Sequence, residues 1–159
     1  LFDPKAEKPD SKKIGMLRKL IFSYKNKERD IDKLLKLYFK IDHLWVGSEN
    51  HMSDFTKQIH KTIYEIKFRK GFNKKAFTQH RRAIKNSGSR YRKLKTIKVP
   101  TLLIHGTDDP LVKASHSVKL ASLIHGSKLV LLKGMGHDFN KNFKNRINSI
   151  ILPHILQYS

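Results

Sequence analysis

The sequence has 159 residues, no cysteine, and 34 Lys and Arg residues against 13 Asp and Glu, which gives a formal net charge of +21. This length suits one domain with a hydrophobic core, and the lack of cysteine excludes disulfides and thiolate metal sites and favours a reducing, cytoplasmic location. Because no apolar run is long enough for a signal peptide or a membrane span, we expect no membrane anchor.

Apolar residues recur at helical spacing through the first part of the chain. This spacing predicts four helices, over residues 10–24 and 30–42, from residue 53 or 54 onward, and after Asn73. Asp10 or Ser11 is the expected N-cap residue of the first helix, and Asp30 is the expected N-cap of the second. The stretch HLWVGSENHMS is expected to form a loop before the third helix, and SGSRYRKLKTIKVP is expected to form a polar hinge after the fourth.

A different pattern begins after the hinge. Two short, continuous apolar runs, TLLIH at 101–105 and LVLL at 129–132, are typical of strands that are buried on both faces. A predicted helix follows each run, over 115–124 and 140–158, and Pro153 is expected to kink or split the second helix. The order strand, helix, strand, helix predicts parallel pairing with a right-handed crossover.

Polar residues follow each predicted strand. The first strand leads into HGTDDPLV, where Asp109 lies three residues after Gly106, and the second leads into KGMGHDF, which contains His137. In open parallel sheets, catalytic groups lie just past the carboxyl ends of the strands. Adjacent loops would let Asp109 accept a hydrogen bond from one imidazole nitrogen of His137 while the other nitrogen faces a nucleophile. The pattern predicts the acid and the base of a catalytic triad.

These residues carry a resemblance to a known family. The segment IKVPTLLIHGTDDPLV, a helix, and then GSKLVLLKGMGHDF together resemble the C-terminal part of the α/β-hydrolase fold. The upstream piece FTQHRRAIKNSGSRYRKLKTIKVPTLLIHG is similar to the end of the helical cap in aclacinomycin methylesterase-like hydrolases. The resemblance covers about residues 76–140, and before that only the helical character carries over.

The resemblance implies an α/β fold in which a helical cap, residues 1–95, precedes the C-terminal part of the hydrolase core, residues 96–159. It implies a serine hydrolase that cleaves carboxylic esters or related acyl bonds. In this family the acid lies in a G-x-x-D turn, which selects Asp109 rather than Asp108, and the histidine follows the last strand, as His137 does 28 positions later. We expect no cofactor and no metal.

The nucleophile of this family stands in a G-x-S-x-G elbow ahead of the cap, and the sequence contains no such motif. Ser48, Ser87 and Ser89 are expected to be loop serines. Because the chain begins with Leu rather than Met, we expect it to be part of a longer protein, with the nucleophile and the oxyanion hole upstream. Alone, it should be inactive and should need the N-terminal half of the fold to cover its strands. Trp45 and Phe55 are candidates for lining the substrate pocket.

Three alternatives stay open. The chain could belong to a non-catalytic, truncated or hydrolase-like binding protein, or to a dehalogenase or epoxide hydrolase, which use an aspartate nucleophile with the same acid and histidine. The third alternative is a binder of nucleic acid or anionic surfaces, because residues 1–98 carry 27 of the 34 Lys and Arg residues against 10 acids. No nucleic-acid-binding module accompanies this charge, so we favour a small ester-like substrate over a nucleic-acid partner.

Overall fold

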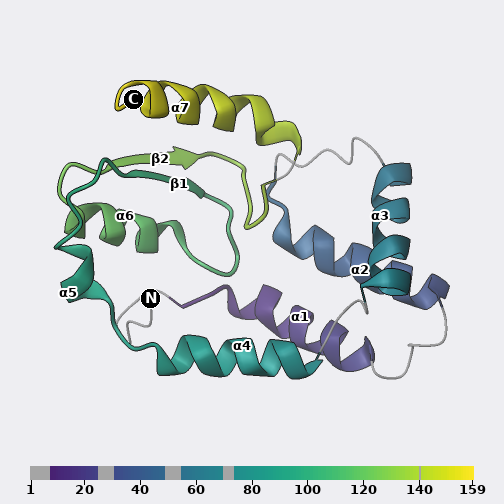
Figure 1. Cartoon of the computed structure of the whole chain (residues 1–159). Helices are drawn as coiled ribbons and strands as arrows, with labels where there is room; N and C mark the ends of the chain where they lie inside the picture. The colour runs from purple at the N-terminus through teal and green to yellow at the C-terminus, as the bar shows by residue number, and fades with distance from the viewer. Residues whose placement is uncertain (1–7, 25–30, 49–54, 70–73, 140) are drawn as a thin grey trace.

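The computed structural model of the chain describes residues 8–24, 31–48, 55–69, 74–139 and 141–159. Its elements are α1 (Ser11–Tyr24), α2 (Ile31–Trp45), α3 (Phe55–Phe68), α4 (Lys74–Asn86), α5 (Tyr91–Leu94), β1 (Leu102–Gly106), α6 (Ala114–Leu123), β2 (Lys128–Leu132), the 3-10 helix η1 (Lys141–Phe143) and α7 (Lys144–Leu156). Figure 1 shows helices α1 to α4, the helical region, beside a sheet flanked by α6 and α7, the α/β region. None of the helices in the described ranges is both long and apolar enough to cross a membrane.

A side-chain cap accounts for the start of α1. The Oδ1 atom of Asp10 accepts a hydrogen bond from the backbone N–H of Lys13 at 3.0 Å, which is the geometry of an N-cap. This backbone hydrogen bond holds the pKa of the Asp10 carboxyl below its usual value. Of the two predicted caps, Asp10 is the one that the structure selects, whereas Asp30 lies outside the described residues.

Helix α2 is longer than the sequence predicts. The periodic pattern places its end at residue 42, but the helix continues to Trp45. Leu37 and Leu44 are both buried, and they lie about two helical turns apart on the same face. Burial of Leu44 therefore extends the apolar stripe and brings Trp45 to the last position of the helix.

The two strands form the parallel pair that the sequence predicts. Ile104 lies opposite Val130, and His105 lies opposite Leu131. In Figure 1, α7 lies over one face of the sheet and α6 over the other, which is the cover that a parallel sheet requires. The core on the α7 side consists of Leu132, Met135, Phe143 and Ile147, against which Ile104, Val130, Ile150 and Ile151 pack.

Helix α7 is not split by its proline. It runs from Lys144 to Leu156 with Pro153 inside it, so of the two predicted outcomes, a kink or a split, the split does not occur. Proline removes the hydrogen bond to the carbonyl of the residue four positions earlier, here Ser149, and this residue is exposed to water. Because Pro153 lies in the last turn, the helix loses one bond near its end and still packs through the buried Ile147.

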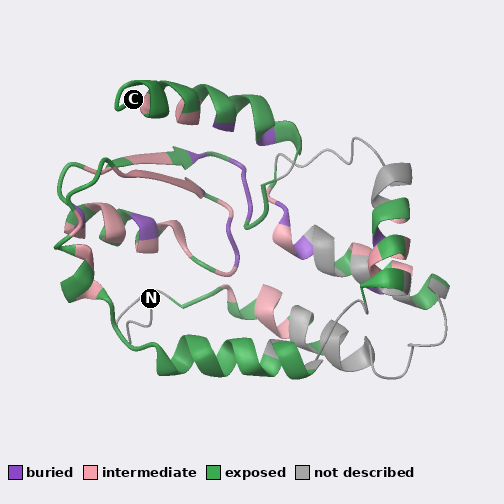
Figure 2. Ribbon diagram, in the orientation of Figure 1, coloured by how far each residue is buried: buried purple, intermediate pink, exposed green. Residues whose placement is uncertain are grey.

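The strands are less buried than the sequence predicts. Their apolar residues are mostly half-buried, and Leu131 keeps 42% of its surface exposed. In the described part of the chain the sheet has two strands, so each strand has one unpaired edge. The end of α7 also exposes Leu152, Ile155 and Leu156, and Figure 2 shows its outer surface as exposed. These apolar surfaces are exposed in the described part of the chain.

The two regions meet through backbone atoms at a contact that we call the junction, formed by residues 45–48 and 134–137. A Cβ atom on Gly47 would lie closer than 3.0 Å to the backbone of Gly134, and a Cβ atom on Gly136 would lie equally close to the backbone of Trp45. Since side chains do not approach backbone so closely, only glycine fits at both positions. The junction holds the end of α2 against the loop that follows β2.

Candidate active site

The loops that follow β1 and β2 are bonded to each other. The backbone N–H of Thr107 donates to the carbonyl of Leu132 at 3.0 Å, and the N–H of Asp108 donates to the carbonyl of Met135 at 2.9 Å. The hydroxyl of Thr107 accepts a third hydrogen bond from the N–H of Gly134 at 3.0 Å. Parallel pairing brings the two strand ends to one edge of the sheet, and these bonds fix the loops side by side there.

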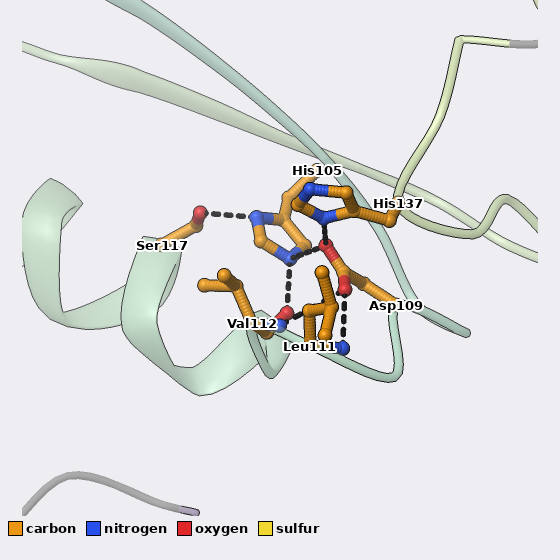
Figure 3. Close-up of polar contacts among 6 residues, drawn as sticks. All are labelled: His105, Asp109, Leu111, Val112, Ser117 and His137. Atoms are coloured by element: carbon orange, nitrogen blue, oxygen red, sulfur yellow. Dashed lines mark hydrogen bonds and ion pairs between the residues drawn. The ribbon is translucent and has the colours of Figure 1, made fainter. Parts of the chain in front are cut away.

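Asp109 and His137 are brought into direct contact at this edge. The Nδ1 atom of His137 lies 2.9 Å from Oδ2 of Asp109, as Figure 3 shows. The other carboxylate oxygen, Oδ1, accepts the backbone N–H groups of Leu111 at 2.8 Å and Val112 at 2.9 Å. One oxygen of Asp109 thus holds the turn that carries it, and the other holds the imidazole.

Asp109 is nearly enclosed, yet it is held in its charged form. Its side chain is 5% exposed. Burial by itself would raise the pKa of the carboxyl, but the hydrogen bond from His137 and the N–H groups of Val112 and Leu111 outweigh burial and lower the pKa. Hydrogen bonds donated to a carboxylate favour its ionised form. Asp109 is therefore an anion that points at His137.

His137 is the exposed partner of the pair, with 38% of its side chain accessible. Its hydrogen bond to Asp109 is the main cause that raises the pKa of the imidazole, burial opposes this, and the charges of Asp109 and Asp138 add to it. Because Nδ1 faces a carboxylate, Nδ1 carries the proton in the neutral ring. Among the described residues, Nε2 makes no hydrogen bond. The neutral ring can accept a proton at Nε2.

The two adjacent aspartates have different partners. Asp109 contacts His137, whereas Asp108 accepts hydrogen bonds from the backbone N–H of Ser48 at 3.1 Å and from the hydroxyl of Thr107 at 2.9 Å. The hydrogen bonds from Ser48 are the main cause that lowers the pKa of Asp108. Asp108 therefore ties the junction to the loop after β1, and Asp109 is the aspartate that faces the histidine.

Trp45 lies against His137 from the helical region. The backbone N–H of His137 donates to the carbonyl of Trp45 at 2.7 Å. The two side-chain rings are 5.5 Å apart between centroids and are tilted by 40°. The end of α2 thus positions both the backbone and the ring of the histidine.

The comparisons with known proteins bear on this arrangement of elements. No family model matches the sequence. The structure is similar to that of an esterase from Exiguobacterium antarcticum, with a TM-score of 0.56 and 17% sequence identity, over 89% of this chain and 47% of the esterase. The fold is that of an α/β-hydrolase.

Two structures of a meta-cleavage product hydrolase, one of them from Pseudomonas fluorescens IP01, also match. Their TM-scores are 0.48 and 0.49, and they are 19% and 18% identical over 80% and 82% of this chain. The chain spans about half the length of the solved structures it matches. It corresponds to the C-terminal portion of the α/β-hydrolase fold, with helices followed by two parallel strands and their flanking helices. The predicted fold class is confirmed.

A second histidine contacts Asp109 in this α/β-hydrolase fold. The Nε2 atom of His105 lies 3.5 Å from Oδ2 of Asp109 and 2.8 Å from the carbonyl oxygen of Val112. Its Nδ1 atom lies 2.7 Å from the hydroxyl of Ser117. In the sequence, His105 is only the last residue of the apolar run at 101–105. Its position four residues before Asp109 could have indicated the contact with that carboxylate. The contact with Ser117 could not be found in this way, because it depends on how α6 packs.

The serines of the loop and the hinge have partners other than His137. The backbone of Ser48 binds Asp108, the hydroxyl of Ser87 donates to the carbonyl of Ile84, and the hydroxyl of Ser89 accepts the N–H of Tyr91. None of these contacts involves His137. Among the described residues, no group of three His, Asp or Glu side chains is placed to hold a metal ion. The side chain of Phe55 lies outside the described residues.

Proposed function

We propose that this chain supplies the acid and the base of a serine hydrolase that cleaves carboxylic esters or related acyl bonds. The observation that carries the proposal is the 2.9 Å contact between Nδ1 of His137 and Oδ2 of Asp109 at the carboxyl ends of two parallel strands. In an α/β sheet this is the edge where catalytic groups gather. A buried anion that binds one side of an exposed imidazole is the acid and base part of a triad.

The proposed reaction runs through Nε2 of His137. A serine from the rest of the fold attacks the ester carbonyl while Nε2 takes its proton, and the same nitrogen returns that proton to the departing alcohol. Water then attacks the acyl-serine, Nε2 takes the water's proton, and the serine leaves with it as the acid is released. Throughout, Asp109 accepts the Nδ1 proton, which fixes the tautomer and stabilises the imidazolium.

Residues 1–95 act as the lid of this enzyme in the proposal, and residues 96–159 as part of its core. The placement of Trp45 beside His137 supports this division, because it brings a side chain of the helical region next to the ring of the proposed base. The substrate is a small ester-like molecule, and the partner that covers the open strand edges is the N-terminal half of the same fold. A cytoplasmic location belongs to the same proposal and is tested by cell fractionation.

The first experiment compares the intact mass of the protein before and after exposure to a fluorophosphonate that reacts with activated serines. This chain of 18.6 kDa alone should gain no adduct. A complete protein, made from the full reading frame, should gain one adduct and should hydrolyse p-nitrophenyl acetate. His137→Ala should remove both properties without changing the circular dichroism spectrum.

Each contrary outcome is informative. Unchanged labelling and turnover in His137→Ala would contradict the assignment of the base. A folded complete protein that takes no adduct but opens epoxides or dehalogenates alkyl halides would contradict the serine and would favour an aspartate nucleophile. A complete protein that shows none of these activities would favour the non-catalytic alternative.

A further inference from the structure

The carboxylate of Asp109 faces two imidazoles, and the proposed reaction uses only one of them. His105 is the second, and its side chain is 12% exposed against 38% for His137. It projects from β1 toward α6, where Ser117 is buried, and Figure 3 shows both rings directed at the same carboxylate. A mostly enclosed histidine with polar partners at both nitrogens is a specific arrangement that the proposed proton transfer leaves unexplained.

The partners of His105 determine where its proton lies. Its Nε2 atom faces two oxygens, the carbonyl of Val112 at 2.8 Å and the carboxylate of Asp109 at 3.5 Å. Since neither oxygen can donate, Nε2 must carry a hydrogen, which it donates to Val112. In the neutral ring Nδ1 is then the acceptor, and the hydroxyl of Ser117 at 2.7 Å donates to it. Ser117 thus matches the tautomer that Val112 and Asp109 require.

Ser117 is not a candidate nucleophile despite its place in this chain of contacts. The order Ser117, His105, Asp109 is that of a triad, but Ser117 is 6% exposed and lies in α6, between the helix and the sheet. A nucleophile must reach the carbonyl of its substrate. The hydroxyl is enclosed, so its use is to orient the ring of His105.

Two sets of hydrogen bonds hold the turn after β1, one from Asp109 and one from His105. From within, Oδ1 of Asp109 accepts the N–H groups of Leu111 and Val112. From outside, His105 binds the carbonyl of Val112 and so attaches the turn to β1. The position of the acid depends on this attachment, because Asp109 and Val112 belong to the same turn.

We propose that His105, oriented by Ser117, is a positioning residue that aims the carboxylate of Asp109 at His137. His105 exchanges no proton with the substrate in this proposal. The effect of His105 on kcat rests on the proposed function. Its effect on the contact between Asp109 and His137 does not. A displacement of about 1 Å in a catalytic group can cost about 100-fold in rate, so the attachment of the turn matters to turnover.

The kinetic test uses two replacements of His105 in the complete protein. Glutamine can place an N–H group where Nε2 stands, and asparagine can place one only where Nδ1 stands. We expect His105→Asn to lower kcat by about 10- to 100-fold with KM changed by less than about 3-fold. We expect His105→Gln to recover kcat to within about 3-fold of the wild type. Equal kcat values for the two variants would overturn the proposal.

The second readout needs no turnover. We would follow the ring resonances of His137 by NMR against pH in the complete protein. The contact with Asp109 raises the pKa of His137, so loss of aim in His105→Asn should lower this pKa, and His105→Gln should keep it. An unchanged pKa in the Asn variant would contradict the positioning role. An increase would contradict it too, because it would mean that His105 only competes with His137 for the carboxylate.

A milder pair of variants covers the case in which His105→Asn does not fold. Ser117→Ala removes the donor to Nδ1, and Ser122→Ala is the matched control, because Ser122 is exposed on the same helix and its hydroxyl only donates to the carbonyl of Lys119 at 2.8 Å. We expect the pKa of His137 and kcat to fall in Ser117→Ala and to stay unchanged in Ser122→Ala. Identical values in both variants would count against the proposal.

The two proposals can fail separately. If the wild-type complete protein takes no fluorophosphonate and hydrolyses no ester, the serine hydrolase is wrong, and the titration of His137 in the variants still tests His105. If the wild type is active and both His105 variants match it in kcat and in the pKa of His137, only the positioning role is wrong.

Discussion

Helix α4 of the helical region and the α/β region differ in the contacts that hold them. The pattern of α4 is local in the sequence, whereas the α/β region is held by contacts between residues that are far apart in the sequence. Between residues 75 and 90, every side chain that the structure describes is exposed, and helix α4 follows from the spacing of its own residues. In the α/β region, Thr107 binds Leu132 and Gly134, and Asp109 binds His137, all far apart in the sequence. Substitutions on the exposed surface of α4 should therefore have small, local effects, and substitutions in the α/β region should affect the site.

The largest expected effect is on kcat, and it should differ between the neighbouring residues Asp108 and Asp109. Asp109→Asn in the complete protein should lower kcat by about 10⁴-fold, because an amide at this position favours the wrong imidazole tautomer. Asp108→Asn is the matched control, and it should lower kcat by less than about 10-fold, because Asp108 binds Ser48 and not His137. Esterase assays on both purified variants check this, and a larger loss in Asp108→Asn would reverse the assignment.

The next largest effect is expected on the free energy of unfolding, which a substitution in the core of the α/β region should lower more than a substitution on α4. Phe143, the residue of η1 that directly precedes α7, is 1% exposed, and Phe143→Ala should lower the free energy of unfolding by about 3–5 kcal/mol. Ile84, which is 48% exposed on α4, is the control, and Ile84→Ala should cost less than about 1 kcal/mol. Urea unfolding of the complete protein measures both. Similar losses would show that α4 is as strongly packed as α7.

Alanine at two glycines should have effects of opposite sign. Gly136→Ala should destabilise the protein by at least about 2 kcal/mol, because the new Cβ would overlap the backbone at the junction. Gly15 lies within α1 with nothing near its missing Cβ, so Gly15→Ala should stabilise it by about 0.5–1 kcal/mol. Thermal unfolding followed by circular dichroism checks both, and a stable Gly136→Ala variant would mean that the junction can open.

The pH dependence of turnover should follow from the raised pKa of His137. His137 must be neutral to act as a base, and Asp109 raises its pKa above the ordinary 6.5, so turnover should rise with pH through a midpoint above that value. Asp109→Asn should move this midpoint to lower pH, and Asp108→Asn should not.

The stability of the fold should depend on pH through the same two residues. Because the pKa of Asp109 is lowered, its contribution to the free energy of unfolding is complete above pH 3.8, and because the pKa of His137 is raised, its contribution is complete below pH 6.5. The pair therefore stabilises the fold fully only between these values.

The smallest effect is expected on the basic surface of α4. Lys75 and Arg82 are exposed, and replacing both by glutamine should change the free energy of unfolding by less than about 0.5 kcal/mol and should leave kcat unchanged. Urea unfolding and esterase assays measure this. A large drop in substrate affinity would instead show that the basic face selects anionic substrates.

The sequence predicted what depends on strand order and left open what depends on packing. Asp109 and His137 could be paired because each follows an apolar run, and parallel strands bring their ends together. The support from Ser117 could not be predicted, because it depends on which side chains of α6 face β1. The contact of Gly47 with Gly134 joins residues 87 positions apart, and no local pattern indicates it. The exposure of Leu131 depends on the number of strands, which the apolar run does not reveal.

The hydrogen bond from the backbone of His137 to the carbonyl of Trp45 has a consequence for recombining enzymes of this fold. Chimeras are made by exchanging one lid for another at a chosen crossover point. Here the residue that would carry the proton is bonded through its own amide to the last residue of α2, and the glycines beside it leave no room for side chains. A donor helical region must therefore bring a backbone carbonyl to the position of Trp45, followed by a glycine at position 47. Grafts should be screened for that backbone match before their pocket residues are compared.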